Sequence, residues 1–147
     1  MKKIMFYALG LTVLLLVSKE LPLHAGQSLN PQMQSLVDSY MTEAKKKEPG
    51  LKSFSAEEGK KLFYSKRQHS EKKEEISCTK CHTDNPAQQG RTPVGKVIEP
   101  LSPTVNKNRF TDPKNVEKWF KRNCEGVLER ECTAKEKGDF VTYMLSL

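Results

Sequence analysis

The chain has 147 residues, of which 36% are hydrophobic and 29% are charged. This length fits one domain, and the small apolar fraction excludes a multi-spanning membrane protein and disfavours a large buried active-site cleft. Lys and Arg number 25 against 18 Asp and Glu, which gives a formal net charge of +7. Because the two signs are interspersed, as in residues 71–75, we assign most charges to solvated surface and do not expect nucleic-acid binding. The positive balance instead favours docking to an acidic partner protein.

Residues 1–25 have the pattern of a secretory signal peptide. Lys2 and Lys3 precede an apolar run over residues 4–17, and the segment ends in Ala25, a small residue suited to signal-peptidase cleavage. A membrane anchor is the alternative, but the run is shorter than the roughly 20 residues needed to span a bilayer. We therefore expect an exported, periplasmic protein with no stable membrane insertion after cleavage.

The first helix of the mature chain is expected to begin at Pro31, after an Asn30 cap, and to end before residues 48–50 (Glu-Pro-Gly). We assign residues 26–54 to this N-terminal helix and a linker. Apolar residues recur within the helix at the spacing of one helical face, namely Met33, Leu36, Val37, Tyr40, Met41 and Ala44.

A second helix is predicted over residues 56–64, because residues 55–58 (Ser-Ala-Glu-Glu) have the pattern of a capping box. Gly59 lies on the apolar face of this segment. A glycine at that position suggests a close helix crossing, and we expect the partner to be the last helix, with Gly59 meeting Phe140 or Tyr143.

Two further helices are predicted in the C-terminal third. Asp112 can cap a helix that opens with Pro113 and extends to about Asn123. Residues 133–136 (Thr-Ala-Lys-Glu) form another capping-box pattern, which predicts a final helix over residues 134–146.

The intervening segments, residues 65–77 and 83–111, are expected to be loops, since the first is almost wholly polar and the second carries several prolines. The sequence shows no convincing strand and no internal repeat. We therefore predict an all-α protein of about four helices, of which three lie in a domain over residues 55–147. A loop as long as the second one requires something at the centre of the domain to organise it.

Residues 78–82 form a C-x-x-C-H motif, the attachment sequence for c-type haem. One tight turn lets both thiols form thioethers with the haem vinyl groups while His82 binds the iron. The alternatives are a thioredoxin-like redox pair, which would need a βαβ pattern, or half of a zinc site, for which only His69, Cys124 and Cys132 remain. We predict one covalently bound haem c per chain, whose apolar ring supplies missing core and a surface for the long loop.

The sixth iron position determines whether a haem only transfers electrons or also binds ligands. Small electron-carrying cytochromes c usually place a Met there, yet no Met lies between Cys81 and Met144. Helical spacing assigns Met144 to the core, as it does Met33 and Met41. His69 lies in a charged stretch where we expect a solvated side chain. His69 and Met144 remain the alternative ligands.

Asn123 is a polar residue at the end of an apolar helical stripe. The other members of that stripe are Val116, Trp119 and Phe120. Asn123 is either a left-handed residue at the helix end or a weak, displaceable iron ligand. Its neighbour Cys124 can pair with Cys132, because disulfides persist in exported proteins. Free thiols or an intermolecular bridge are the other options for these cysteines.

From residue 55 to 147 the chain resembles the sphaeroides haem protein (SHP) type of monohaem c-type cytochrome. C-x-x-C-H is common to all c-type cytochromes, whereas Arg-Asn-Cys followed by a spaced Cys is specific to this type. The similar segments are residues 77–82, 95–103, 109–112, 116–119, 122–124 and 130–133.

The resemblance implies a class I cytochrome c fold, with Asn123 as the sixth ligand of the oxidised iron and a disulfide between Cys124 and Cys132. It also implies a high-spin haem that binds small diatomics such as O2 or NO when reduced. Electrons would come from other cytochromes, such as a dihaem cytochrome c or a membrane cytochrome b, and slow oxygen reduction is a further activity to consider. A plain low-spin shuttle with a permanent sixth ligand is the alternative, followed by a haem-stabilised structural module without turnover.

Three further residues are expected to contact the haem, namely Trp119, Pro100 and Leu101. Pro100 and Leu101 end the proline-rich loop, and we expect them beside the proximal face. A main-chain carbonyl there would accept a hydrogen bond from Nδ1 of His82 and orient the ring.

Overall fold

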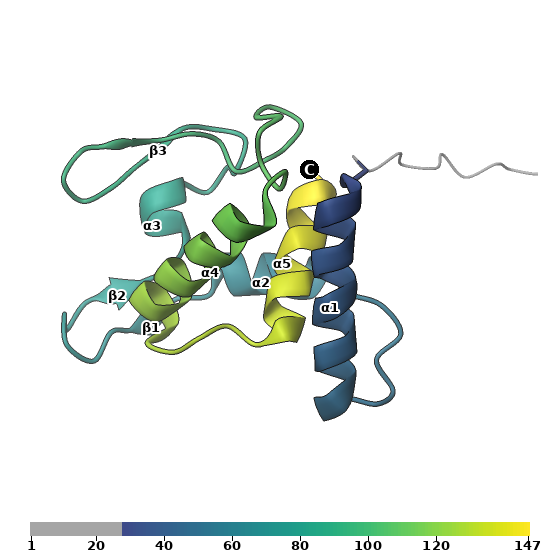
Figure 1. The fold of residues 1–147 in the computed structure, drawn as a ribbon. Helices are drawn as coiled ribbons and strands as arrows, with labels where there is room; N and C mark the ends of the chain where they lie inside the picture. Colours follow the sequence, from purple (N-terminus) through teal and green to yellow (C-terminus); the bar gives the residue numbers. More distant parts are fainter. Residues whose placement is uncertain (1–27) are drawn as a thin grey trace, which may run out of the picture.

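The computed structural model describes residues 28–147, so the predicted signal peptide, residues 1–25, lies outside the described residues. Helices form the scaffold, which confirms the all-α prediction, and no helix within residues 28–147 is long and apolar enough to cross a membrane. The elements in chain order are α1 (Pro31–Lys47), α2 (Ala56–Tyr64), β1 (Arg67–Gln68), β2 (Glu75–Ile76), α3 (Thr79–His82), β3 (Gly90–Arg91), β4 (Val97–Ile98), α4 (Pro113–Leu128) and α5 (Ala134–Leu145) (Figure 1).

The longer helices begin where their capping residues predict. In α5 the capping box is reciprocal, because Thr133 Oγ1 accepts from Glu136 N at 3.2 Å and the Glu136 carboxylate accepts from Thr133 N at 2.8 Å. In α2, Ser55 N donates instead to Asp139 Oδ1 of α5 at 2.7 Å, so the start of α2 is tied to the helix that it crosses. The four capping residues are Asn30, Ser55, Asp112 and Thr133.

The predicted end of α4 near Asn123 is wrong, because the helix continues to Leu128. The left-handed residue is Glu129, with φ 54°, so the interpretation of Asn123 as a left-handed terminal residue is also wrong. The helix continues because Leu128 packs against the same core cluster as Phe120 and Cys124, one turn farther along.

The two segments predicted to be loops each contain a short antiparallel hairpin. Strand β1 pairs with β2, and β3 pairs with β4, which corrects the prediction of a chain without strands. Ladders of two residues are too short to produce a period-two hydrophobic pattern. A Cβ on Gly90 in β3 would lie 1.9 Å from the Cys81 carbonyl oxygen, so β3 passes directly against α3.

The close crossing predicted at Gly59 is confirmed. A Cβ there would lie 2.1 Å from the Asp139 carbonyl oxygen and 2.9 Å from Phe140 N, so α2 and α5 meet backbone to backbone. Two apolar clusters flank α5. One is Phe63, Tyr143 and Met144, and the other is Met33, Tyr40, Val116, Phe120, Cys124 and Val141. Helix α1 thus contributes buried side chains to the core of the domain.

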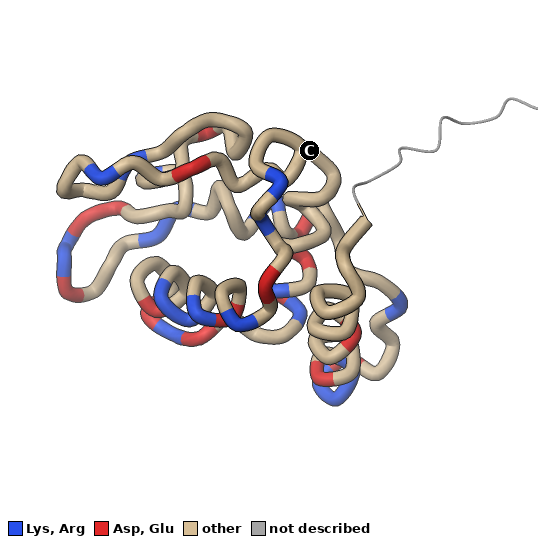
Figure 2. The backbone as a smooth tube through the Cα atoms, turned by 45° about the horizontal axis from the view of Figure 1, so that its top comes forward, with Lys and Arg blue, Asp and Glu red and all other residues tan. Residues whose placement is uncertain are grey.

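Charged side chains cover the surface, as the interspersed pattern predicts, but α4 carries a row of Lys and Arg (Figure 2). Its exposed basic residues are Lys114, Lys118, Lys121 and Arg122. Within residues 28–147 none of these four forms an ion pair. This row gives one side of the helix a local positive field.

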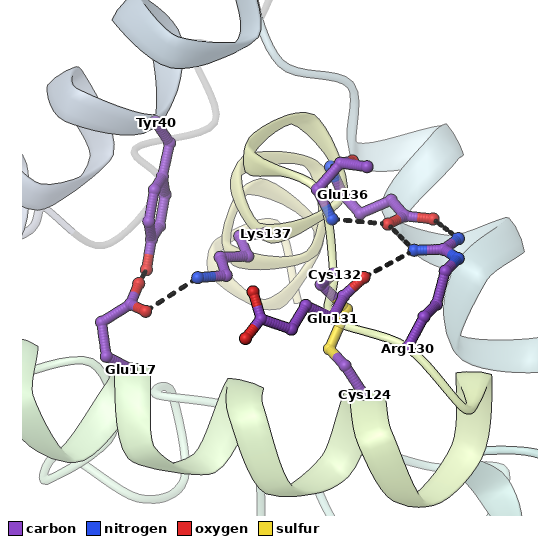
Figure 3. Close-up of a disulfide and its surroundings, with 9 residues drawn as sticks. Tyr40, Glu117, Cys124, Arg130, Glu131, Cys132, Glu136 and Lys137 are labelled. Carbon is purple, nitrogen blue, oxygen red and sulfur yellow. Dashed lines mark hydrogen bonds and ion pairs between the residues drawn. A yellow bond between two sulfur atoms is a disulfide. The ribbon is translucent and has the colours of Figure 1, made fainter.

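Cys124 and Cys132 form a disulfide that links α4 to the segment preceding α5, with their Cα atoms 5.5 Å apart (Figure 3). The connecting segment is braced by Arg130, whose guanidinium pairs with the Glu136 carboxylate at 2.6 and 2.8 Å. The position of α4 relative to α5 is therefore fixed by a covalent bond and a bidentate ion pair.

Gly59→Ala is expected to lower the free energy of unfolding by about 1–3 kcal/mol, because the new methyl group overpacks the crossing of α2 and α5. The matched control is Gly126→Ala in α4, where a Cβ meets nothing within 4 Å and alanine's helix propensity should stabilise by up to about 1 kcal/mol. Urea unfolding of both variants measures the difference. Wild-type stability of the Gly59 variant would contradict the crossing.

Removing the disulfide with the double variant Cys124→Ser/Cys132→Ser should lower the free energy of unfolding by about 2.5 kcal/mol, because the bridge closes a short loop in the unfolded chain. The cysteines are eight positions apart in the sequence. Chemical denaturation under non-reducing conditions measures the loss. Reductant should lower the wild-type midpoint toward that of the variant and leave the variant unchanged, and an effect of equal size on both would argue against this account.

Candidate functional site

The C-x-x-C-H motif forms the single helical turn α3, which lies between the two hairpins (Figure 1). Cys78 occupies the N-cap position and His82 is the last helical residue. The turn is closed by His82 N, which donates to the Cys78 carbonyl oxygen at 3.1 Å. Cys78 and Cys81 are both free thiols and half-buried. One turn of chain therefore gathers two thiols and an imidazole.

The protonation state of His82 suits the ligation of haem iron. Burial, and then the nearby charge of Arg109, lowers the pKa of His82 to about 4, so its imidazole is neutral and can donate a lone pair to a metal at pH 7. Burial raises the pKa of Cys78 to about 11, which keeps it as a thiol. Two free thiols followed at once by a neutral imidazole are the donor set that fits covalently attached haem.

The zinc alternative finds no support in the described part of the chain. No group of three or more His, Cys, Asp or Glu side chains in residues 28–147 is arranged to hold a metal ion. Of the three residues left as partners for the C-x-x-C pair, Cys124 and Cys132 are bonded to each other. The third, His69, is held in the β1–β2 turn, where its Nδ1 accepts from two main-chain N–H groups.

The segment expected on the proximal side is held by Arg109, a residue to which we assigned no role from the sequence. The Pro100 carbonyl accepts from Arg109 Nε at 2.7 Å and from Asn106 Nδ2 at 3.3 Å. These donors, and not Nδ1 of His82, are the partners of that carbonyl. Leu101 packs against the apolar cluster at the α2–α5 crossing, as Cys78 does. Sequence reasoning missed the role of Arg109, because its hydrogen-bond acceptors, the carbonyls of Glu99 and Pro100, lie at the other end of a loop.

The predicted apolar face of α4 divides into two faces. Val116 and Phe120 are buried in the core, whereas Trp119 is 44% exposed and Asn123 is exposed in the polypeptide, so only Val116 and Phe120 of the predicted stripe pack against other side chains of the core. Trp119 and Asn123 are four positions apart and share a second face of the helix. The Arg122 guanidinium lies over the Trp119 ring, 5.6 Å from its centroid. This second face presents an indole and an amide away from the helical core.

The alternative sixth ligands are engaged elsewhere. His69 was expected to be solvated but is only 5% exposed, because its ring closes the β1–β2 turn and Nδ1 accepts from Glu71 N at 3.2 Å and Lys72 N at 3.3 Å. Met144 is 0% exposed and packs with Phe63, in agreement with its expected place in the core.

Comparison with known proteins identifies the family. Residues 49–144 match the model described as "Domain of unknown function (DUF1924)". Cytochrome c'' of Methylophilus methylotrophus is 37% identical over 114 residues, which are 77% of this chain and 78% of the relative. The cytochrome c-type protein SHP of Cereibacter sphaeroides is 44% identical over 89 residues, 60% of this chain and 68% of the relative.

Solved structures agree with this assignment. The crystal structure of oxidised Methylophilus methylotrophus cytochrome c'' superposes with a TM-score of 0.69 at 38% identity, covering 77% of this chain and 92% of that one. The structure of oxidised SHP, described as an oxygen binding cytochrome c, superposes with a TM-score of 0.64 at 33% identity. It covers 80% of this chain and 97% of that one. The class I cytochrome c fold predicted from the sequence is thereby confirmed. The chain belongs to the SHP-type family of monohaem c-type cytochromes, with haem c as its covalent cofactor.

Proposed function

We propose that this protein is a periplasmic cytochrome that accepts an electron from another cytochrome and binds a small diatomic ligand, O2 or NO, at a position that Asn123 vacates on reduction. Cys78 and Cys81 would attach the haem, and His82 would bind its iron in both oxidation states. The haem would supply an iron that changes oxidation state and can bind a further ligand. The observation that carries the proposal is the exposed amide of Asn123 beside the disulfide-bonded Cys124.

The engagement of the competing side chains supports Asn123 as the displaceable ligand. Met144 has no exposed surface and fills the core, and the ring of His69 is held by two main-chain N–H groups of its own turn. Recruiting either as a ligand would break packing or a turn, whereas the Asn123 amide is already exposed on its helix.

The chemistry of an amide oxygen accounts for redox-dependent release. It is a hard, neutral donor and suits ferric iron better than the softer ferrous state. Asn123 should therefore bind in the oxidised protein, leave on reduction and return on reoxidation. The Cys124–Cys132 bridge limits how far its backbone moves while it is detached.

The descriptions of two relatives support this cycle. SHP is described as an oxygen binding cytochrome c, and the solution structure of cytochrome c'' is described as giving insight into haem-ligand detachment. The solution structure superposes on this chain with a TM-score of 0.68 at 37% identity, covering 78% of this chain and 92% of that one. In a plain low-spin shuttle, which remains the alternative, the sixth ligand would stay bound in both oxidation states.

The basic row on α4 supports docking of an acidic redox partner. The charged groups of Lys118 and Arg122 both lie over the Trp119 ring, on the helix that carries Asn123. A positive patch steers an acidic partner toward that side of the molecule and raises the association rate at low salt. A dihaem cytochrome c or a membrane cytochrome b with an acidic docking surface fits this role.

Asn123→Ala should leave covalent attachment intact and raise the rate at which azide or cyanide binds the ferric protein by at least about tenfold, because no competing ligand then limits the open fraction. Stopped-flow absorbance measures the rates. Asn115→Ala, at another exposed Asn of α4, is the matched control and should behave as wild type.

Carbon monoxide binding to the ferrous wild-type protein completes this experiment. Rapid binding is expected, since Asn123 should already have left. Unchanged ferric rates in the Asn123 variant, or a six-coordinate ferrous wild type that refuses carbon monoxide, would return the protein to the shuttle class.

A further inference from the structure

The β1–β2 hairpin is bound to the end of α4 through one carboxylate. Ser70, in the hairpin turn, donates from its main-chain N to Glu129 Oε2 at 3.0 Å and from its hydroxyl to Glu129 Oε1. Glu129 is the left-handed residue that ends α4. Both hydrogen bonds favour the ionised form and lower the pKa of the Glu129 carboxyl below its ordinary value. This exposed contact joins two parts of the chain that are 59 positions apart in the sequence.

The turn that presents Ser70 has a fixed shape. His69 N donates to the Glu74 carbonyl oxygen at 2.9 Å, and Lys73 N donates to the His69 carbonyl oxygen at 3.1 Å. The His69 ring is buried beneath the turn, and its Nδ1 accepts hydrogen bonds from Glu71 N and Lys72 N. Because the imidazole organises the turn from inside, Ser70 is held where it can reach Glu129.

The hairpin is also bound to the haem-attachment turn. Glu74 pairs with Lys80 Nζ at 2.6 Å, and Lys80 lies between the two cysteines of the motif. Strand β2 also runs directly through the buried Ser77 into Cys78. The hairpin is thus connected to α3 by the chain itself and by an ion pair.

We propose that Ser70 and Glu129 form a latch, through which the hairpin sets the position of Asn123 relative to the attachment turn. Asn123 lies in the C-terminal half of α4 and Glu129 is its C-cap, so we expect a shift of Glu129 to move Asn123 as well. Glu129 is therefore a positioning residue for Asn123. This inference rests on the proposed role of Asn123 as a displaceable ligand.

The latch and the disulfide restrain α4 in different directions. Cys124–Cys132 joins the helix to the start of α5, whereas Ser70–Glu129 joins it to the segment that carries the haem-binding thiols. With only the disulfide intact, α4 can shift away from α3 without breaking a covalent bond. Opening the latch should thus weaken ferric ligation by Asn123 and slow its return after reoxidation, with Cys78, Cys81 and His82 unaffected.

The test uses the haem-loaded protein and the variants Glu129→Ala and Ser70→Ala. Glu129→Ala removes both hydrogen bonds and should raise the rate of azide binding to the ferric form at least about fivefold, the lower end of typical coupling between sites. Ser70→Ala removes only the hydrogen bond of the hydroxyl and should raise the rate less, and the double variant should match Glu129→Ala. Glu125→Ala, at an exposed glutamate on α4, is the control and should keep the wild-type rate. Thermal unfolding of each variant identifies any that fails to fold, and Ser70→Ala leaves α4 itself unaltered.

The Asn123→Ala background separates the two proposals. There, Glu129→Ala should have no further effect on azide binding. If Asn123→Ala raises the rate but neither latch variant does, the latch is overturned and the ligand role of Asn123 stands. If Glu129→Ala raises the azide-binding rate as much in the Asn123→Ala background as in the wild type, the Ser70–Glu129 contact acts on access to the iron and not through Asn123. The latch is then also overturned. If Asn123→Ala itself changes nothing, the ligand role fails and the latch fails with it.

Discussion

The backbone contact between α2 and α5 at Gly59 is the constraint on which the site depends. Helix α2 leads through the first hairpin into the haem-attachment turn, and α5 is joined by the disulfide to the helix that carries Asn123. Ser55 N donates to the buried Asp139 carboxylate at the same crossing, so the two helices are held by a hydrogen bond as well as by close packing. With few aliphatic residues available, this contact fixes both halves of the site relative to each other.

Helix α4 is held at several points along its length, although the face that carries Trp119 and Asn123 is not part of the core. Asn30 Nδ2 donates to the Thr111 carbonyl oxygen at 2.8 Å, just before α4 begins. In the middle of the helix, the Glu117 carboxylate accepts from Tyr40 of α1 and from Lys137 Nζ of α5, the latter at 2.7 Å (Figure 3). Helix α1 precedes the segment that matches the family model, yet it supplies two of these contacts. We attribute to α1 the role of an additional brace.

Local signals and long-range contacts differ in how well the sequence predicted them. The capping residues and the C-x-x-C-H turn act within four residues, and the helix starts they predict are confirmed. The extension of α4 to Leu128 depends on one further core contact, which periodicity alone did not reveal. The burial of His69 required a turn whose anchor, Glu129, is distant in sequence. The polar residues around His69 indicated a solvated side chain. A local sequence pattern shows the polarity of a segment, but it does not show which distant segment covers His69 in the fold.

The proposed cycle also links the restraints on α4 to the electron affinity of the site. If Asn123 binds the oxidised state more strongly than the reduced one, every contact that holds it in place stabilises the oxidised state and lowers the reduction potential by linkage. A diatomic that binds only after Asn123 leaves would stabilise the reduced state and raise the reduction potential. The disulfide and the hairpin contact then do more than hold a fold together. In the proposed cycle they would also set the reduction potential at which Asn123 leaves the iron.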